Sequence, residues 1–289
     1  MKDLIRLFRL KPPEDAHDAW PWPVKIQTLG KFEVRVNDEP IQFSRKLPRK
    51  SLMLLKALIA CGGVDVPEQM LCDLLWGDED GDAAVNALAI TIVRLRKLLG
   101  VNEAILHHGG KISLNPQLCW TDALAFEARL SEEGNRNLLE LYGGTFLPED
   151  TGESWSVATR ERLRGKFIHA LSAYGTALEQ EGDLDDAAKC YLRGIDADPI
   201  VEVFHQGLMR CLDRLGRRTE AISAYRRMKQ TLSVVLGVPP SDASQKFYQN
   251  LLQKQIEDGA DFEADTYASR TASVTILPAR RARKSRRQQ

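Results

Sequence analysis

Residues 179–191, EQEGDLDDAAKCY, recur 34 positions later as residues 213–225, DRLGRRTEAISAY. Four positions return at this offset, Leu178, Gly182, Ala187 and Tyr191, as Leu212, Gly216, Ala221 and Tyr225. Ala173 likewise returns as Gly207, so both copies carry a small residue there. Two unrelated pairs of helices would rarely share so many offsets. The pattern therefore predicts two copies of one helix–turn–helix unit.

A period of 34 residues, with small residues where helices cross, is typical of the tetratricopeptide repeat. Two copies alone would leave apolar faces exposed, so we expect additional helices before Ala170 and after Pro240 to cap the stack. Residues 121–256 are thus predicted to form an all-α helical repeat domain. Residues 257–289 are acidic and then basic, a composition typical of a disordered tail.

The chain before the repeats has a mixed pattern. Residues 1–23 include prolines that interrupt any helix, and we interpret them as a leader or linker. Residues 24–43, VKIQTLGKFEVRVNDEPIQF, alternate apolar and polar side chains and predict three short antiparallel strands. Residues 104–114, AILHHGGKISL, predict a β-hairpin that turns at Gly109 and Gly110.

Between the strands and the hairpin, the spacing of apolar residues predicts three helices. The first follows Arg49 and ends at Gly62, and the second begins near Pro67 and ends near Trp76. The third covers residues 83–99, with Asp82 as its N-cap. Residues 24–120 are therefore predicted to form one domain of strands, three helices and a hairpin.

The third helix, which includes residues 88–100, LAITIVRLRKLLG, has two different faces. At 100° per residue, the core face is predicted to hold Val85, Leu88, Ile92, Leu95 and Leu99. The opposite face combines Asn, Lys and Arg with outward Ile and Val, which suits the DNA major groove. Charges on a helix face are more often simply solvated, and outward apolar residues could equally mark a contact with another protein.

Composition narrows the function without deciding it. The chain has 40 Lys or Arg and 40 Asp or Glu, so no net field attracts nucleic acid. Residues 24–120 contain twelve basic and eleven acidic residues, a net charge of +1, so any DNA affinity must come from a local patch. The five scattered cysteines favour reduced thiols over disulfides or a zinc site.

The sequence also predicts a cellular location and the absence of a catalytic or cofactor site. It contains no long apolar run and no secretory signal pattern, which favours a cytoplasmic protein without membrane contact. It contains no GxxxxGK[ST], GxSxG, HExxH or GxGxxG motif. We therefore expect neither catalytic residues, nor a metal, nor a cofactor, and classify the chain as a non-enzyme.

The ordered combination of these elements resembles a known family. The segments DLLWG and RLRKLLG, ending the second and third helices, are similar to an OmpR-type winged helix. LYGGTFLPED and the repeats resemble the bacterial transcriptional activator domain. Together, residues 24–256 resemble SARP/AfsR-like bacterial transcriptional regulators. The implied fold is mixed but mainly α: a winged helix-turn-helix with a small β-sheet and wing, followed by the all-α tetratricopeptide-like domain.

The resemblance implies roles for particular residues of this chain. The third helix would enter the major groove, where the candidates for reading bases are Asn86, Ala89, Ile90, Val93, Arg94 and Lys97. The candidates for phosphate contact are Arg45, Lys46, Arg49, Lys50, Arg96 and Lys111. The hairpin would be a wing, with His107, His108, Gly109 and Gly110 at its tip. The wing sequence GKISL departs from the Gly-Tyr-Arg-Leu usual in the family and lacks its aromatic residue.

The predicted function is therefore a DNA-binding transcriptional regulator, most simply an activator. Its partners would be double-stranded promoter DNA, RNA polymerase or another protein, and a second copy in a homodimer. The alternative is a protein-interaction scaffold whose winged helix no longer binds specific DNA and docks a partner through Ile90 and Val93.

Overall fold

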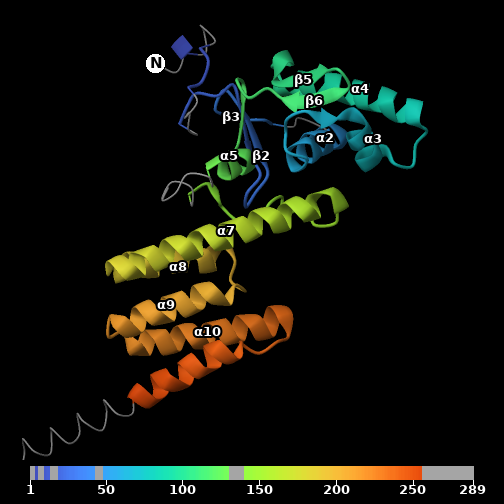
Figure 1. Cartoon of the computed structure of the whole chain (residues 1–289). Coiled ribbons are helices and arrows are strands. Elements are labelled where there is room, and N and C mark those ends of the chain that lie inside the picture. The colour runs from blue at the N-terminus through green and yellow to red at the C-terminus, as the bar shows by residue number, and fades with distance from the viewer. Residues whose placement is uncertain (1–3, 6–9, 14–18, 43–47, 130–139, 256–289) are drawn as a thin grey trace, which may run out of the picture.

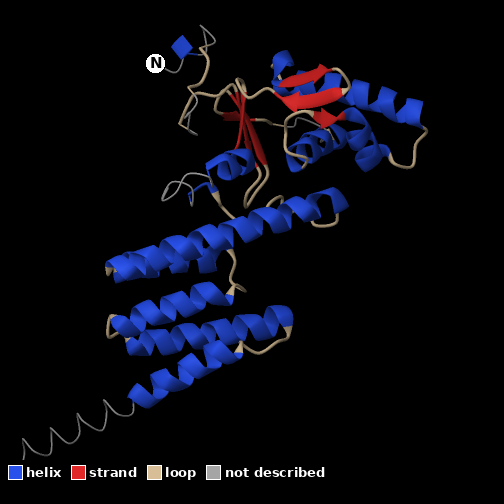
Figure 2. Ribbon diagram, viewed as in Figure 1, coloured by secondary structure: helices blue, strands red, loops and turns tan. Residues whose placement is uncertain are grey.

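The computed structural model describes residues 4–5, 10–13, 19–42, 48–129 and 140–255. A part that combines strands and helices lies at one end of the molecule, and a stack of helices lies at the other (Figure 1). Within the described residues, the strands all belong to the first part (Figure 2). The predicted fold class, a winged helix-turn-helix followed by an all-α repeat domain, is confirmed. The predicted tail, residues 257–289, lies outside the described residues.

The N-terminal sheet contains the three predicted strands and one more. Strands β1 (Val24–Gln27), β2 (Glu33–Val36) and β3 (Glu39–Pro40) pair in antiparallel fashion. The additional strand, β7 (Cys119–Thr121), runs parallel to β1 and places Cys119 opposite Val24. Strand β7 follows the hairpin in the sequence and pairs with β1, so the sheet brings the beginning and the end of this first part together.

The three predicted helices are present as α2 (Arg49–Ala60), α3 (Glu68–Trp76) and α4 (Gly81–Leu99). Helix α4 begins two residues earlier than predicted. Its N-cap position is Asp80, so the prediction of Asp82 as N-cap was wrong. Asp82 lies in the first helical turn, where a negative charge is favourable near the exposed backbone N–H groups.

The predicted hairpin forms a second sheet beside these helices. Strands β5 (Ile105–His108) and β6 (Lys111–Leu114) pair with each other, and β6 also pairs with β4 (Val66–Pro67). The short strand β4 leads directly into α3. Backbone hydrogen bonds between β4 and β6 thereby hold the hairpin at the start of α3. The hairpin also follows α4 directly in the sequence.

The repeat domain is a stack of α7 (Ser154–Glu181), α8 (Leu184–Ala197), α9 (Glu202–Arg214) and α10 (Arg218–Leu236). Residues 242–255 form a further helix after α10, as predicted for the end of the stack. The helix expected before Ala170 is the first half of α7 itself and not a separate element.

The repeated residues occupy equivalent places in the two turns. Gly182 and Gly216 both have left-handed backbones, with φ of 90° and 74°. The amide of Asp183 donates to the carbonyl of Leu178, and that of Arg217 donates to the carbonyl of Leu212, again 34 residues later. A side chain at either glycine would strain this conformation, which explains why both copies carry glycine.

Several contacts join the two parts. The Thr159 hydroxyl on α7 donates to the carbonyl of Ala60 at the end of α2, at 2.7 Å. Lys56 on α2 forms an ion pair with Asp150, with Nζ 2.6 Å from Oδ2, and both side chains are largely buried. The domain boundary between residues 120 and 121 stays a prediction, and the buried core continues across it.

Candidate DNA-binding face

Helix α4 is held in its domain by one apolar face. Leu88, Ile92, Leu95 and Leu99 are at most 2% exposed. Val85, which the helical spacing also assigned to this face, is 39% exposed, so that prediction was wrong. Ala84, which is 4% exposed, takes the core position at this end of the helix, and Val85 lies at the edge of the buried face, about 80° from Leu95. Four residues over three turns fix the orientation of α4 and hence of its outer face.

The opposite face of α4 is open. All six residues predicted to read bases are exposed, namely Asn86, Ala89, Ile90, Val93, Arg94 and Lys97. Ile90 is 53% exposed and Val93 is 63% exposed, so neither side chain contributes to the core. The structure thus brings these six residues together on one accessible helix surface, while their role in reading bases stays a prediction.

Arg96 on α4 contacts the wing. Its Nε and Nη2 donate to the carbonyl of Ile105 at 3.1 and 2.8 Å. This double hydrogen bond ties the last turns of α4 to the first residue of β5. Two of the three guanidinium nitrogens are engaged within the domain, so Arg96 aligns the wing with α4. The sequence pattern had suggested only a phosphate contact for this residue, and that role stays a prediction.

The wing turns tightly at two glycines. Gly109 and Gly110 have φ of 57° and 72°, as a two-residue hairpin turn requires. His107, His108 and Lys111 are exposed on either side of the turn. His107 Nε2 lies 2.8 Å from Glu68 Oε2, and the amide of Glu68 donates to the carbonyl of Gly110. Glu68 therefore fixes the wing tip against the start of α3.

The phosphate candidates near α2 divide into three cases. Arg49 is exposed at the first position of α2. Lys50 donates from Nζ to the carbonyl of Leu75 at 2.9 Å and lies 5.1 Å from the centre of the Trp76 ring, so its charge is partly used to hold α3. Arg45 and Lys46 lie outside the described residues.

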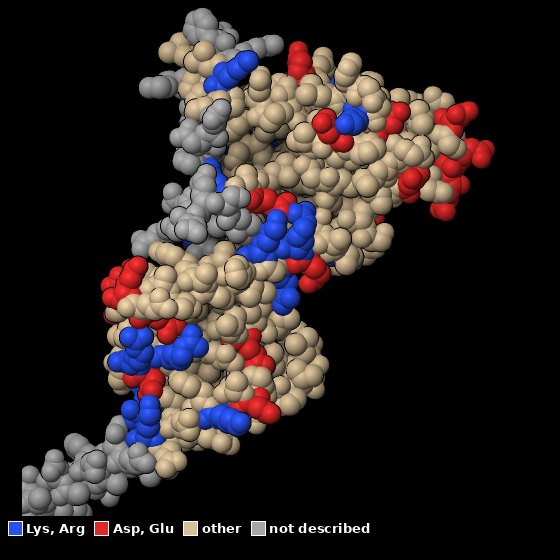
Figure 3. All heavy atoms as spheres, viewed as in Figure 1, with Lys and Arg blue, Asp and Glu red and all other residues tan. Residues whose placement is uncertain are grey.

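Charge is distributed unevenly along α4. Four exposed acidic residues surround its N-terminal end, namely Asp78, Glu79, Asp80 and Asp82. Figure 3 shows acidic side chains gathered at the end of the molecule where the α3–α4 loop lies. Arg94 and Lys97 lie in the C-terminal half of the same helix. The acidic residues would repel phosphates at the first end and the basic residues would attract them at the second, so phosphate contacts are favoured near the C-terminal half of α4.

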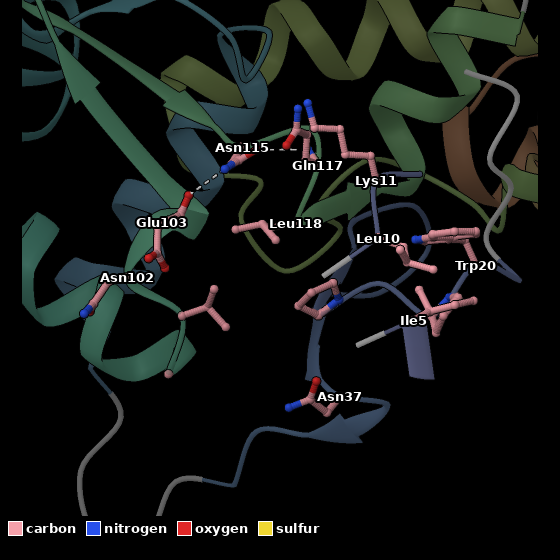
Figure 4. A pocket seen from close by; sticks show the side chains of 14 residues that line it. Ile5, Leu10, Lys11, Trp20, Asn37, Asn102, Glu103, Asn115, Gln117 and Leu118 are labelled. Carbon is pink, nitrogen blue, oxygen red and sulfur yellow. Dashed lines mark hydrogen bonds between the residues drawn. The ribbon is translucent and has the colours of Figure 1, made fainter. Parts of the chain in front are cut away.

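A cavity of about 530 Å³ lies behind this face, at the C-terminal end of α4 (Figure 4). Its lining joins Leu10 and Trp20 of the N-terminal segment with Val101 and Leu118, which follow α4 and the hairpin. Asn115 braces one wall, donating from Nδ2 to the carbonyl of Glu103 at 3.0 Å. No sequence pattern pointed to this cavity, because it forms between segments far apart in the chain. None of the residues predicted to read bases lines it.

Four basic residues lie close together on α7, and all of them form contacts within the chain, namely Arg160, Arg162, Arg164 and Lys166. Arg160 donates to the carbonyls of Phe146, Leu147 and Asp150, and so holds the segment that precedes α7. Arg162 and Lys166 share the carboxylate of Glu127. These contacts hold the segments that precede α7 against it and leave α4 as the better candidate for DNA contact.

The five cysteines carry free thiols, and all but Cys61 are buried. Burial raises the pKa of Cys119 to about 12 and those of Cys190 and Cys211 to about 11, so these thiols are protonated and unreactive near neutral pH. Within the described residues, no group of three or more His, Cys, Asp or Glu could hold a metal ion. No helix in the same part of the chain is long and apolar enough to cross a membrane.

Comparison with known proteins covers both parts of the chain. The family model of the bacterial transcriptional activator domain matches residues 127–252. Regulatory protein DnrI of Streptomyces peucetius is 27% identical over 259 residues, which cover 80% of this chain and 92% of DnrI. The chain is therefore similar to SARP-like regulators. Regulatory protein AfsR of Streptomyces coelicolor is 28% identical over 248 residues, which cover 78% of this chain but only 24% of AfsR.

The fold of the chain also has a solved counterpart. The structure of Mycobacterium tuberculosis EmbR in complex with low affinity phosphopeptide aligns with a TM-score of 0.55 and 19% sequence identity. The alignment covers 81% of this chain and 66% of the EmbR chain. At this identity the likeness concerns the fold, and it confirms a winged helix joined to a helical domain.

Proposed function

We propose that this chain activates transcription in the cytoplasm by binding promoter DNA. Helix α4 enters the major groove, and the wing contacts the adjacent backbone or minor groove. The helical repeat domain contacts a second copy or RNA polymerase. The chain has no catalytic role in this proposal and needs no cofactor.

One observation carries the proposal. Helix α4 is pinned by four buried apolar residues, while its six candidate residues are exposed together on the opposite side. A major groove accepts one helix of this width, and Asn, Arg and Lys are side chains that pair with base edges. The relatives named above are regulatory proteins, which supports this assignment.

The test begins with DNA recovered from cells by capture with the protein, followed by mobility shifts on the recovered site. Binding through phosphates releases counterions, so the logarithm of affinity should fall linearly with the logarithm of salt, by about 0.9 per phosphate contacted. Affinity that does not change with salt would contradict the proposal.

Arg94→Ala tests base reading directly. If Arg94 pairs with a base, this variant should lose about 1–3 kcal/mol of specific binding at fixed salt. Arg226 on α10 is an exposed arginine outside the winged helix, so Arg226→Ala serves as a matched control. An Arg94→Ala variant that binds the site as tightly as Arg226→Ala would remove Arg94 from the base-reading set.

A second candidate function follows from the exposure of Ile90 and Val93. An interaction scaffold would bury these side chains against a partner protein instead of DNA. Such docking should depend little on salt, because apolar burial involves few counterions. The salt titration therefore separates the two functions on the same protein.

A further inference from the structure

Two branched apolar side chains are exposed in the middle of α4. Ile90 and Val93 are 53% and 63% exposed, whereas the same helix buries four large aliphatic residues toward the core, namely Leu88, Ile92, Leu95 and Leu99. They are three positions apart and therefore lie on the same side of the helix, about 4.5 Å apart along its axis. Ala89 extends this small apolar surface, and Asn86 lies one turn before Ile90.

The surroundings of this surface favour DNA over a protein partner. Arg94 and Lys97 flank it and are exposed, and within the described residues neither has an ion-pair partner. Two available cations beside an apolar pair complement a groove lined by phosphates. In the major groove, the one apolar group that a base pair presents is the C5-methyl of thymine.

The two side chains are spaced to reach neighbouring base pairs. Successive base pairs rise by about 3.4 Å, about 1 Å less than the axial separation of Ile90 and Val93, a difference that side-chain rotamers can accommodate. We propose that Ile90 and Val93 read the thymine methyl groups of neighbouring base pairs, so that the target sites carry adjacent A·T pairs under α4. This inference rests on the proposed function and names the class of DNA that the face recognises. Asn86 is placed to pair with an adenine beside them.

Replacement of thymine by deoxyuridine tests this inference, because it removes the methyl group and leaves base pairing intact. In the recovered site, each thymine is replaced singly and then in adjacent pairs, and affinity is measured by mobility shift at fixed salt. Burial of one methyl group is worth about 0.8 kcal/mol, which corresponds to a loss of about fourfold for one methyl and about fifteenfold for two.

Variants assign the effect to the two side chains. The double variant Ile90→Ala/Val93→Ala should bind the thymine and deoxyuridine sites equally, since it has no apolar partner for the methyl groups. Val234 on α10 is 78% exposed, so Val234→Ala is a matched control that should keep the full difference between the two sites. Because Ile90, Val93 and Val234 are all outside the core, thermal unfolding should show that each variant remains folded.

The outcomes separate this inference from the proposed function. Site-specific, salt-dependent binding that is indifferent to deoxyuridine overturns methyl reading and leaves DNA binding intact. A difference between the two sites that persists in Ile90→Ala/Val93→Ala also overturns it. Failure to bind any recovered site overturns the proposed function and this inference together. A protein partner captured by the chain, lost in the double variant and retained at high salt, would place the scaffold function there instead.

Discussion

Substitution of Gly207 by alanine probes how the repeats pack. Gly207 on α9 faces the ring of Tyr191 on α8, and a Cβ at Gly207 would lie 2.4 Å from Cζ of that ring. The ring cannot move away, because a Cβ built at Gly175 on α7 would lie 2.6 Å from the same atom on another side. Tyr191 is 1% exposed, and its hydroxyl donates to Glu179 at 2.7 Å. The added methyl must therefore separate α8 from α9.

The expected loss of stability follows from two opposing terms. Overpacking of a tight core costs about 1–3 kcal/mol, and three ring atoms within 2.5 Å place Gly207 at the upper end of that range. Alanine is about 1 kcal/mol better than glycine inside a helix. The net loss is about 2 kcal/mol. If the two parts unfold together as one unit of more than about 150 residues, a loss of about 2 kcal/mol should lower the melting temperature by roughly 4–8 °C.

The assay is thermal unfolding followed by circular dichroism at 222 nm. Gly165 on α7 provides the matched control, since a Cβ there meets nothing within 4 Å, and Gly165→Ala should stabilise the chain by about 1 kcal/mol. In the double variant Tyr191→Leu/Gly207→Ala, the smaller side chain at position 191 relieves the contact. The double variant should therefore lose less stability than the sum of the losses of the two single variants. A Gly207→Ala variant that melts at or above the wild-type temperature would refute the reasoning.

Two further changes test charged contacts. Burial alone would raise the pKa of Glu179, but hydrogen bonds from Arg210 and Tyr191 hold that pKa below its usual 4.5. This contribution is present above pH 4.5 and lost as pH falls through the folded-state pKa, so Glu179→Gln should destabilise at pH 7 and approach wild type below pH 4.5, as measured by urea unfolding. Lys56→Met leaves the largely buried Asp150 unpaired and should cost about 1–3 kcal/mol in the same assay. Equal stability of Lys56→Met and wild type would show that this pair does not hold the two parts together.

The repeat and the wing could be predicted because their signals are local. The offset of 34 residues reappears as equivalent hydrogen bonds after Leu178 and Leu212. Gly109 and Gly110 adopt the positive φ that made their sequence a turn signal. In both cases the residues that carry the pattern also make the contact, so no knowledge of distant segments was needed.

Contacts between segments far apart in the sequence have no local pattern from which they could be predicted. Strand β7 pairs with β1, although about 90 residues separate them in the sequence. Asp122, directly after β7, is 2% exposed and accepts hydrogen bonds from the amides of Thr28 and Leu29. Arg96 looked like a free cation on a helix and is engaged with Ile105. The candidate site was predicted as a face of α4, whereas the contacts that align this face required the structure.

The connection between the two parts bears on how a regulator of this design would work. Helix α2 packs against α4 on one side and against α7 on the other. The contacts of Lys56 and Ala60 join α2 to the repeat domain through largely buried groups. A flexible linker would let the repeats sample many directions, but here the single helix α2 contacts both α4 and the first helix of the stack. Under the proposed function, the orientation of α4 in the groove therefore sets which side of the repeats faces a second copy or RNA polymerase.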